Sequence, residues 1–235
     1  MRHIVSQTVK WLGGRLTILP ALLLIVAGTW AFFELADELG EREMEAFEHK
    51  VLQALRKPDD SKSLIGPEWM DDIVRDITAL GGYAVLTLLT LAVVGFLCLD
   101  RKFAASWFVV GTILSGFAVS MSLKAFFDRP RPTIVPPLSE VYTSSFPSGH
   151  SMMSTIIFFT LGTLLATVTA RRRLKFYFLV LAVLLTGLVG ASRVYLGVHY
   201  PTDVLAGWSA GLVWSSTCWL IARSLQRCGR INTKI

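Results

Sequence analysis

Charged residues are scarce in this chain, and so are cysteines. Only 17% of the 235 residues are charged and 53% are hydrophobic, whereas about 25% are charged in a typical soluble domain. The apolar excess lies in long runs, which places the chain among membrane proteins. Cys98, Cys218 and Cys228 are too few and too widely spaced for a disulfide framework or a zinc site. The chain lacks internal repeats and low-complexity segments, so its length suits a single domain, residues 1–235.

Six apolar runs come close to the roughly 20 residues that a helix needs to cross a bilayer. We therefore expect an all-α fold, an integral membrane bundle of six transmembrane helices. The first run is long for a signal peptide and no small-residue cleavage site follows it, so we expect it to be retained. The expected spans are Leu16–Leu35, Thr78–Leu99, Ala104–Leu123, Ser148–Thr169, Phe176–Ser192 and Val204–Ala222.

The net charge of +6 comes from basic residues scattered at the ends of the apolar runs. This distribution indicates membrane topology and argues against a nucleic-acid partner. In a six-span chain all four basic segments lie on one side, which the positive-inside rule assigns to the cytoplasm. We thus predict a multi-pass protein of the cell (inner) membrane with both termini cytoplasmic. The basic residues are Arg2, Lys10, Arg15, Arg101, Lys102, Arg171, Arg172, Arg173, Lys175, Arg223, Arg227, Arg230 and Lys234.

Residues 36–77, between the first two spans, are acidic and are predicted to lie outside. A helical stripe of apolar residues runs through this segment until Pro58, at Met44, Phe47, Val51 and Leu55. We expect an amphipathic helix on the outer membrane surface or over the mouth of the bundle. Simple interfacial packing is favoured over a role as a substrate gate.

Polar and ionisable residues near the spans gather in three clusters, residues 124–132, 146–151 and 192–203. Such groups are costly near a membrane and usually mark function. In the six-span topology all three clusters fall on the outer face. Basic residues at the span ends alone set that topology, so the convergence independently supports one site.

The first chemical feature of these clusters is a set of cations, Lys124, Arg131 and Arg193. Guanidinium and ammonium groups suit the oxygens of a phosphate and of a phosphoryl group in transfer. Ser148 is placed to be the N-cap of the helix that follows. Gly149 would let an anion approach the backbone N–H groups at that helix start.

The second feature is a pair of histidines, His150 and His199. An imidazole can attack phosphorus or protonate a leaving oxygen near neutral pH. Asp203 follows His199 by one helical turn, and Pro201 between them suits the first turn of a helix. The carboxylate can therefore reach the imidazole and set its tautomer, as in nucleophile–base–acid triads.

Together these residues resemble the signature of the type-2 phosphatidic acid phosphatase superfamily, the lipid phosphate phosphatases, and among them a small bacterial membrane member. The signature has three parts, K-x6-R-P, P-S-G-H and S-R-x5-H-x3-D, and every position matches in order. The matching residues are Lys124, Arg131, Pro132, Pro147, Ser148, Gly149, His150, Ser192, Arg193, His199 and Asp203.

The resemblance implies a role for each of these side chains and implies neither a metal nor a cofactor. His199 would attack phosphorus and become a phosphohistidine, and Asp203 would orient it. His150 would protonate the leaving oxygen and then activate the hydrolytic water. The residues expected to hold the phosphate are Lys124, Arg131, Ser148, Gly149 and Arg193.

The expected function is hydrolysis of a lipid phosphate monoester or diphosphate presented in the outer leaflet of the bilayer. Resemblance to small bacterial members favours undecaprenyl diphosphate or phosphatidylglycerol phosphate over phosphatidic acid or lipid A phosphate. A lipid phosphotransferase with the same histidine site is the main alternative, and a channel or transporter is a remote one. Vanadium haloperoxidases share the signature, but six apolar spans argue against them. The oligomeric state is left open.

Two further pairs of residues are assigned no role in this chemistry. Asp128 and Arg129 lie inside the first cluster and are expected to pair or face water. Gly207 and Gly211 form a small-residue pair suited to helix packing in the sixth span.

Overall fold

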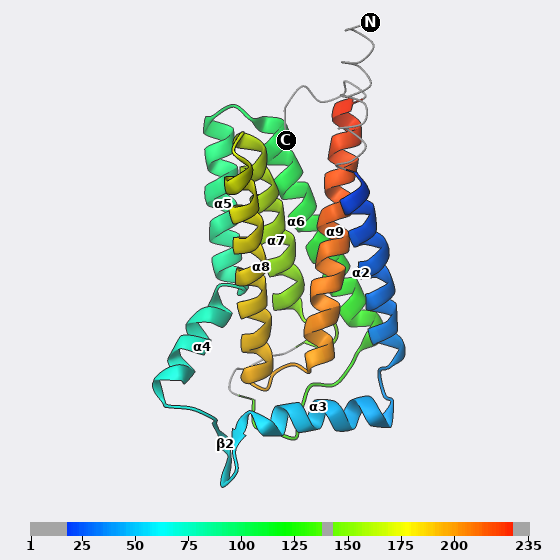
Figure 1. The fold of residues 1–235 in the computed structure, drawn as a ribbon, viewed down its shortest axis with the longest axis vertical. Helices are drawn as coiled ribbons and strands as arrows, with labels where there is room; N and C mark the ends of the chain where they lie inside the picture. Colours follow the sequence, from blue (N-terminus) through cyan, green and yellow to red (C-terminus); the bar gives the residue numbers. More distant parts are fainter. Residues whose placement is uncertain (1–17, 138–142, 228–235) are drawn as a thin grey trace, which may run out of the picture.

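The computed structural model describes residues 18–137 and 143–227 and shows a bundle of long helices with a small cap at one end (Figure 1). Helices α2, α5, α6, α7, α8 and α9 form the bundle, and α3, α4 and a short hairpin form the cap. The helices are α2 Leu19–Asp37, α3 Arg42–Ala54, α4 Trp69–Ala79, α5 Tyr83–Leu99, α6 Phe103–Phe127, α7 Gly149–Val168, α8 Arg172–Tyr195 and α9 Pro201–Arg227; the strands are β1 Arg56–Lys57 and β2 Asp60–Leu64.

The expected all-α membrane bundle is confirmed. Within the described ranges, five helices are long and apolar enough to cross a membrane, and the bent pair of α4 and α5 makes a sixth. The basic residues before Leu19 and after Arg227 lie outside the described residues, as does the expected start of the first span.

The second span differs from the prediction, which began it at Thr78 as part of one continuous helix. The chain bends by 46° between α4 and α5, and α5 itself begins at Tyr83. At the bend, a Cβ added to Gly81 would lie 2.3 Å from Val189 Cγ1 on α8. Gly82 has an extended backbone as the N-cap of α5. The close approach to α8 therefore needs glycine where the helix breaks.

Helix α8 is longer than the predicted Phe176–Ser192 because it begins at Arg172 and ends at Tyr195. The helix can include the basic residues at its start because long basic side chains extend toward water while their stems stay on apolar surface. The extra turn at the other end carries Arg193 into the bundle, where its side chain is buried.

Helix α7 is the central element, because 56% of its most apolar 18-residue stretch is buried inside the protein. Helix α9 lies against it through Gly207 and Gly211, the pair expected to serve packing. A Cβ added to Gly207 would lie 2.7 Å from the carbonyl oxygen of Ser148, and one added to Gly211 would lie 2.6 Å from Thr155 Cβ. Small residues thus bring the two backbones together, as in other membrane bundles.

The cap over the bundle contains the predicted amphipathic helix, and Met44, Val51 and Leu55 of the expected stripe are partly buried. Helix α3 lies across the end of the bundle (Figure 1). Phe47 of the expected apolar stripe is 55% exposed, whereas Glu48 and Leu52 are fully buried. The hydropathy pattern therefore misplaced Phe47 and missed Glu48, whose burial depends on its ion pair with Arg129. The hairpin and α4 that follow were not expected.

Candidate active site

Four helix ends meet beneath the cap and carry the predicted site residues. Helices α6 and α8 end there with Lys124 and Arg193, and α7 and α9 begin there with His150 and Asp203 (Figure 1). Because consecutive helices run in opposite directions, the three sequence clusters reach the same end of the bundle. The structure therefore brings the clusters to one place, as the sequence predicted.

His199 and Asp203 form the expected pair. Nδ1 of His199 lies 3.3 Å from Oδ2 of Asp203, and the two residues are 1% and 0% exposed. Pro201 is the first residue of α9, as expected. The turn before it contains Gly197 with φ +71, where an added Cβ would lie 2.4 Å from a guanidinium nitrogen of Arg56. This turn returns the chain from α8 and places His199 against the carboxylate.

The surroundings of His199 define which of its nitrogens is available. With Nδ1 donating toward Asp203, Nε2 is the acceptor, and NH1 of Arg131 lies 3.3 Å from it. Burial lowers the pKa of His199 to about 4, more than the hydrogen bond and charge of Asp203 raise it. The imidazole is therefore neutral at neutral pH, with a lone pair on Nε2.

The three expected cations are held by neutral oxygens. Lys124 Nζ donates to the Ser144 carbonyl at 2.6 Å, and Arg193 NH1 donates to Thr78 Oγ1 at 3.1 Å. Arg131 donates through Nε to the Thr143 carbonyl at 2.7 Å. In residues 18–137 and 143–227 none of the three cations forms an ion pair, and the buried Nε of Arg193 has no hydrogen-bond partner. Such concentrated, unneutralised charge suits an anion.

The start of α7 adjoins these cations. Ser148 occupies the N-cap position, as expected, but its side chain makes no capping hydrogen bond. Its hydroxyl instead accepts a hydrogen bond from Ser151 at 3.1 Å. A Cβ added to Gly149 would lie 3.1 Å from the Tyr83 hydroxyl and 3.3 Å from Lys124 Cε. The glycine thus keeps the helix start open and close to a cation, which suits a bound phosphate.

Sequence reasoning missed two residues that contact Asp203. The Ser145 hydroxyl donates a short hydrogen bond to Oδ2 of Asp203 and lies 3.4 Å from Nδ1 of His199. NH1 of Arg129 donates to Oδ1 of Asp203 at 2.7 Å, so the expectation that Arg129 only pairs with Asp128 or faces water was wrong. Ser145 stands just before the P-S-G-H motif, and that position was its one available signal.

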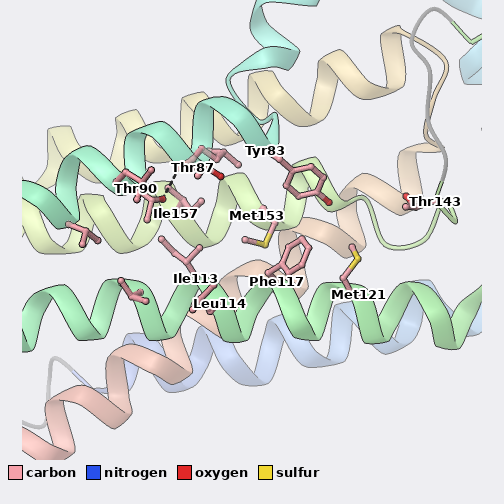
Figure 2. Close-up of a pocket in the computed structure, with 14 residues that line it drawn as sticks. Tyr83, Thr87, Thr90, Ile113, Leu114, Phe117, Met121, Thr143, Met153 and Ile157 are labelled. Atoms are coloured by element: carbon pink, nitrogen blue, oxygen red, sulfur yellow. Dashed lines mark hydrogen bonds between the residues drawn. The ribbon is translucent and has the colours of Figure 1, made fainter.

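An apolar cavity of about 530 Å³ between α5, α6 and α7 reaches the site (Figure 2). Its polar end contains Tyr83, whose ring centroid is 6.0 Å from that of His150, and Thr143, a partner of Arg131. Farther along the helices its lining includes Leu91 and Leu114, which are 61% and 64% exposed on the outside of the bundle. The cavity therefore extends from neighbours of His150 and Arg131 to side chains exposed on the outside of the bundle.

The chain is similar to known proteins in sequence and in fold. A model of the PAP2 superfamily matches residues 104–227. The chain is similar to phosphatidylglycerophosphatase B of Bacillus subtilis, with 32% identity over 153 residues, 64% of this chain and 74% of that protein. It is 36% identical to an undecaprenyl-diphosphatase of Sulfolobus acidocaldarius over 67 residues, 28% of each chain. Its fold is similar to the crystal structure of a transmembrane PAP2 type phosphatidylglycerolphosphate phosphatase from Bacillus subtilis, with a TM-score of 0.79, 26% identity, and coverage of 87% of this chain and 98% of that one.

Proposed function

Because the chain belongs to the PAP2 superfamily of membrane phosphatases, we propose that it hydrolyses a lipid phosphate at the site formed by His199, His150 and Asp203. The observation that carries this proposal is the apolar cavity whose lining includes Thr143, a hydrogen-bond partner of Arg131, and Tyr83, whose ring lies 6.0 Å from that of His150. A phosphate bound by the cations would leave an attached hydrocarbon chain beside the cavity between α5 and α6. A soluble phosphate ester has no hydrocarbon chain that could contact this apolar lining.

The proposed reaction has two displacements at phosphorus. Nε2 of His199 attacks, the bond from phosphorus to the lipid oxygen breaks, and His150 gives its proton to that oxygen. Asp203 holds the Nδ1 proton and stabilises the positive charge that the ring acquires. His150 then takes a proton from water, whose oxygen displaces Nε2 and releases inorganic phosphate. Arg131 lies at Nε2 already, so it can shift to the phosphoryl oxygens as their charge develops.

Phosphatidylglycerol phosphate is the substrate we place first. The relative with this activity in its name aligns with 64% of the chain, and the solved structure of the same type covers 87% of it. Undecaprenyl diphosphate is second, supported by the shorter match to an undecaprenyl-diphosphatase. The residues at the site recognise phosphate, so the lipid is selected elsewhere in the cavity.

Phosphate release from a panel of lipids tests the function. The purified protein should release inorganic phosphate from phosphatidylglycerol phosphate faster than from undecaprenyl diphosphate, phosphatidic acid or lipid A phosphate. Activity should survive excess EDTA, since fixed cations rather than a metal ion are proposed to stabilise the phosphoryl group. A parallel His199→Ala preparation reports contaminating phosphatases.

Two results of this panel contradict the proposal. One is the absence of phosphate release from all four lipids. The other is activity that EDTA removes and Mg²⁺ or Zn²⁺ restores. Phosphate that appears on an added alcohol instead of in solution identifies a phosphotransferase, the alternative with the same histidine chemistry.

We place the site at the outer face of the cell membrane, in a single domain of residues 1–235 with both termini cytoplasmic. The basic residues on the α5–α6 and α7–α8 links support this orientation. The start of α2 and the end of α9 both lie at the end of the bundle opposite the cap, which agrees with an even number of spans (Figure 1).

Cysteine labelling on intact cells tests the orientation. In a variant whose native cysteines are replaced by alanine, a cysteine introduced at Ser63 should react with an impermeant thiol reagent. One at Ala170, in the α7–α8 link, should react only after the cells are broken. Labelling of Ala170→Cys but not Ser63→Cys on intact cells reverses the proposed topology.

A further inference from the structure

Helix α3 carries a carboxylate, Glu48, that is 0% exposed, while Glu43 and Glu45 on the same helix face outward. Burying an ionised carboxylate is costly unless it is paired and hydrogen-bonded. Glu48 meets both conditions at once, and its partners belong to the site.

Arg129 joins Glu48 to Asp203. Its NH2 donates to Oε2 of Glu48 at 2.6 Å, and its NH1 donates to Oδ1 of Asp203 at 2.7 Å. Thr202 closes the network, because its hydroxyl donates to Oε1 of Glu48 and accepts from Arg129 NH1 at 2.9 Å. The guanidinium also lies 4.2 Å from the ring centroid of Tyr200. Both ends of the guanidinium are therefore held by carboxylates in a defined geometry.

The charges in this network bear on the histidine. A guanidinium paired with Asp203 alone would cancel much of the negative charge that Asp203 presents to His199. Glu48 supplies a second negative charge to the same guanidinium, so two carboxylates share one cation. Asp203 keeps more of its charge for the imidazole, and its Oδ1 stays fixed while Oδ2 faces His199.

We propose that Glu48 and Arg129 are positioning residues of the phosphatase reaction, which hold Asp203 in place and balance its charge so that His199 is an effective nucleophile. This inference rests on the proposed function. It gives the cap helix α3 a part in the chemistry, because a carboxylate on α3 acts on the pair formed by His199, in the α8–α9 link, and Asp203 of α9.

The groups that act on His199 come from every neighbouring element. They are Asp203 of α9, Arg131 of the α6–α7 link, Arg193 of α8 and His150 of α7. Arg129 and Glu48 act on it through Asp203. Removing the negative charge of Glu48 should therefore make protonation of His199 harder, and removing the positive charge of Arg129 should make it easier.

The test measures kcat, KM and the acid limb of kcat/KM in two variants. Glu48→Gln should lower kcat about tenfold, the equivalent of one pKa unit, with KM near wild type. Its acid limb should move to lower pH, whereas that of Arg129→Gln should move to higher pH. The ionisation of the substrate is common to all variants, so differences among them report on the enzyme. Glu43→Gln, the same charge change on the exposed face of α3, should match wild type.

A combined variant separates positioning from simple docking of the cap. Since Glu48 acts through Arg129, the Glu48→Gln/Arg129→Gln protein should be no slower than Arg129→Gln alone. Glu48→Asp keeps the charge and should keep the wild-type pH profile even where it lowers stability. It provides the test if Glu48→Gln does not fold.

The inference is overturned if Glu48→Gln behaves like Glu43→Gln, if the two single losses multiply in the combined variant, or if both acid limbs move the same way. A shifted acid limb in Glu48→Asp also overturns it. Failure of the proposed function looks different, because the wild-type protein would then release no phosphate from any of the four lipids, whatever the Glu48 variants do.

Discussion

Replacing His199 with alanine is expected to lower phosphate release by about 10⁴-fold or more, the size of loss seen when a nucleophile is removed from a triad. Nε2 of His199 is the atom that would bond to phosphorus, and Asp203 at 3.3 Å from Nδ1 leaves its lone pair free. Binding should change little, because the cations that hold the phosphate remain. Steady-state kinetics with the preferred lipid should put the loss in kcat and not in KM.

His49→Ala is the matched control, because His49 lies on the cap with its ring stacked 6.4 Å from that of Tyr200. It should retain wild-type turnover. Asp203→Asn should bind substrate and turn over slowly, since an amide cannot stabilise the charged ring. Turnover of His199→Ala near the wild-type rate contradicts the assignment of the nucleophile.

Replacing His150 with alanine is expected to have an effect that depends on the leaving group. With a lipid alkoxide, loss of the general acid should slow release by about 10²- to 10⁴-fold. With p-nitrophenyl phosphate the first displacement needs little protonation and should stay fast. The second displacement still needs His150 to activate water, so p-nitrophenolate should appear as a stoichiometric burst followed by slow turnover.

Rapid-mixing absorbance measurements follow this burst directly. The wild-type protein is the control, and it should turn over p-nitrophenyl phosphate without accumulating the intermediate to the same extent. Equal losses with both leaving groups, and no burst, contradict the role of His150 as the acid and base of the reaction.

Much of the site could be predicted from the sequence because its residues lie in three short clusters near the ends of apolar runs. His199 and Asp203 are one helical turn apart, so helical geometry brings them together without help from the rest of the fold. Lys124 and Arg193 stand at helix ends that an even number of spans places on one side. Hydropathy and the positions of the basic residues were therefore sufficient to predict that these residues lie at one end of the bundle.

The contacts of the cap could not be predicted from hydropathy and local spacing. Glu48 and Glu43 are the same residue type on the same helix, yet Glu48 is buried and Glu43 is exposed. The difference lies in Arg129 and Thr202, which are far away along the chain and meet Glu48 only in the folded protein. The break of the second span likewise depends on Val189 of α8 against Gly81. Contacts between distant residues, and not local periodicity, decided both features.

The central claim is that phosphate is carried transiently on His199. The most direct measurement is to mix the enzyme with labelled substrate, quench within one turnover, and map the acid-labile, base-stable phosphate by mass spectrometry of peptides. We predict phosphate on the imidazole of His199 in the wild-type protein, more of it in His150→Ala, and none in His199→Ala. Phosphate on His150 in the wild-type protein, or a phosphorylated enzyme that persists in His199→Ala, would contradict the account.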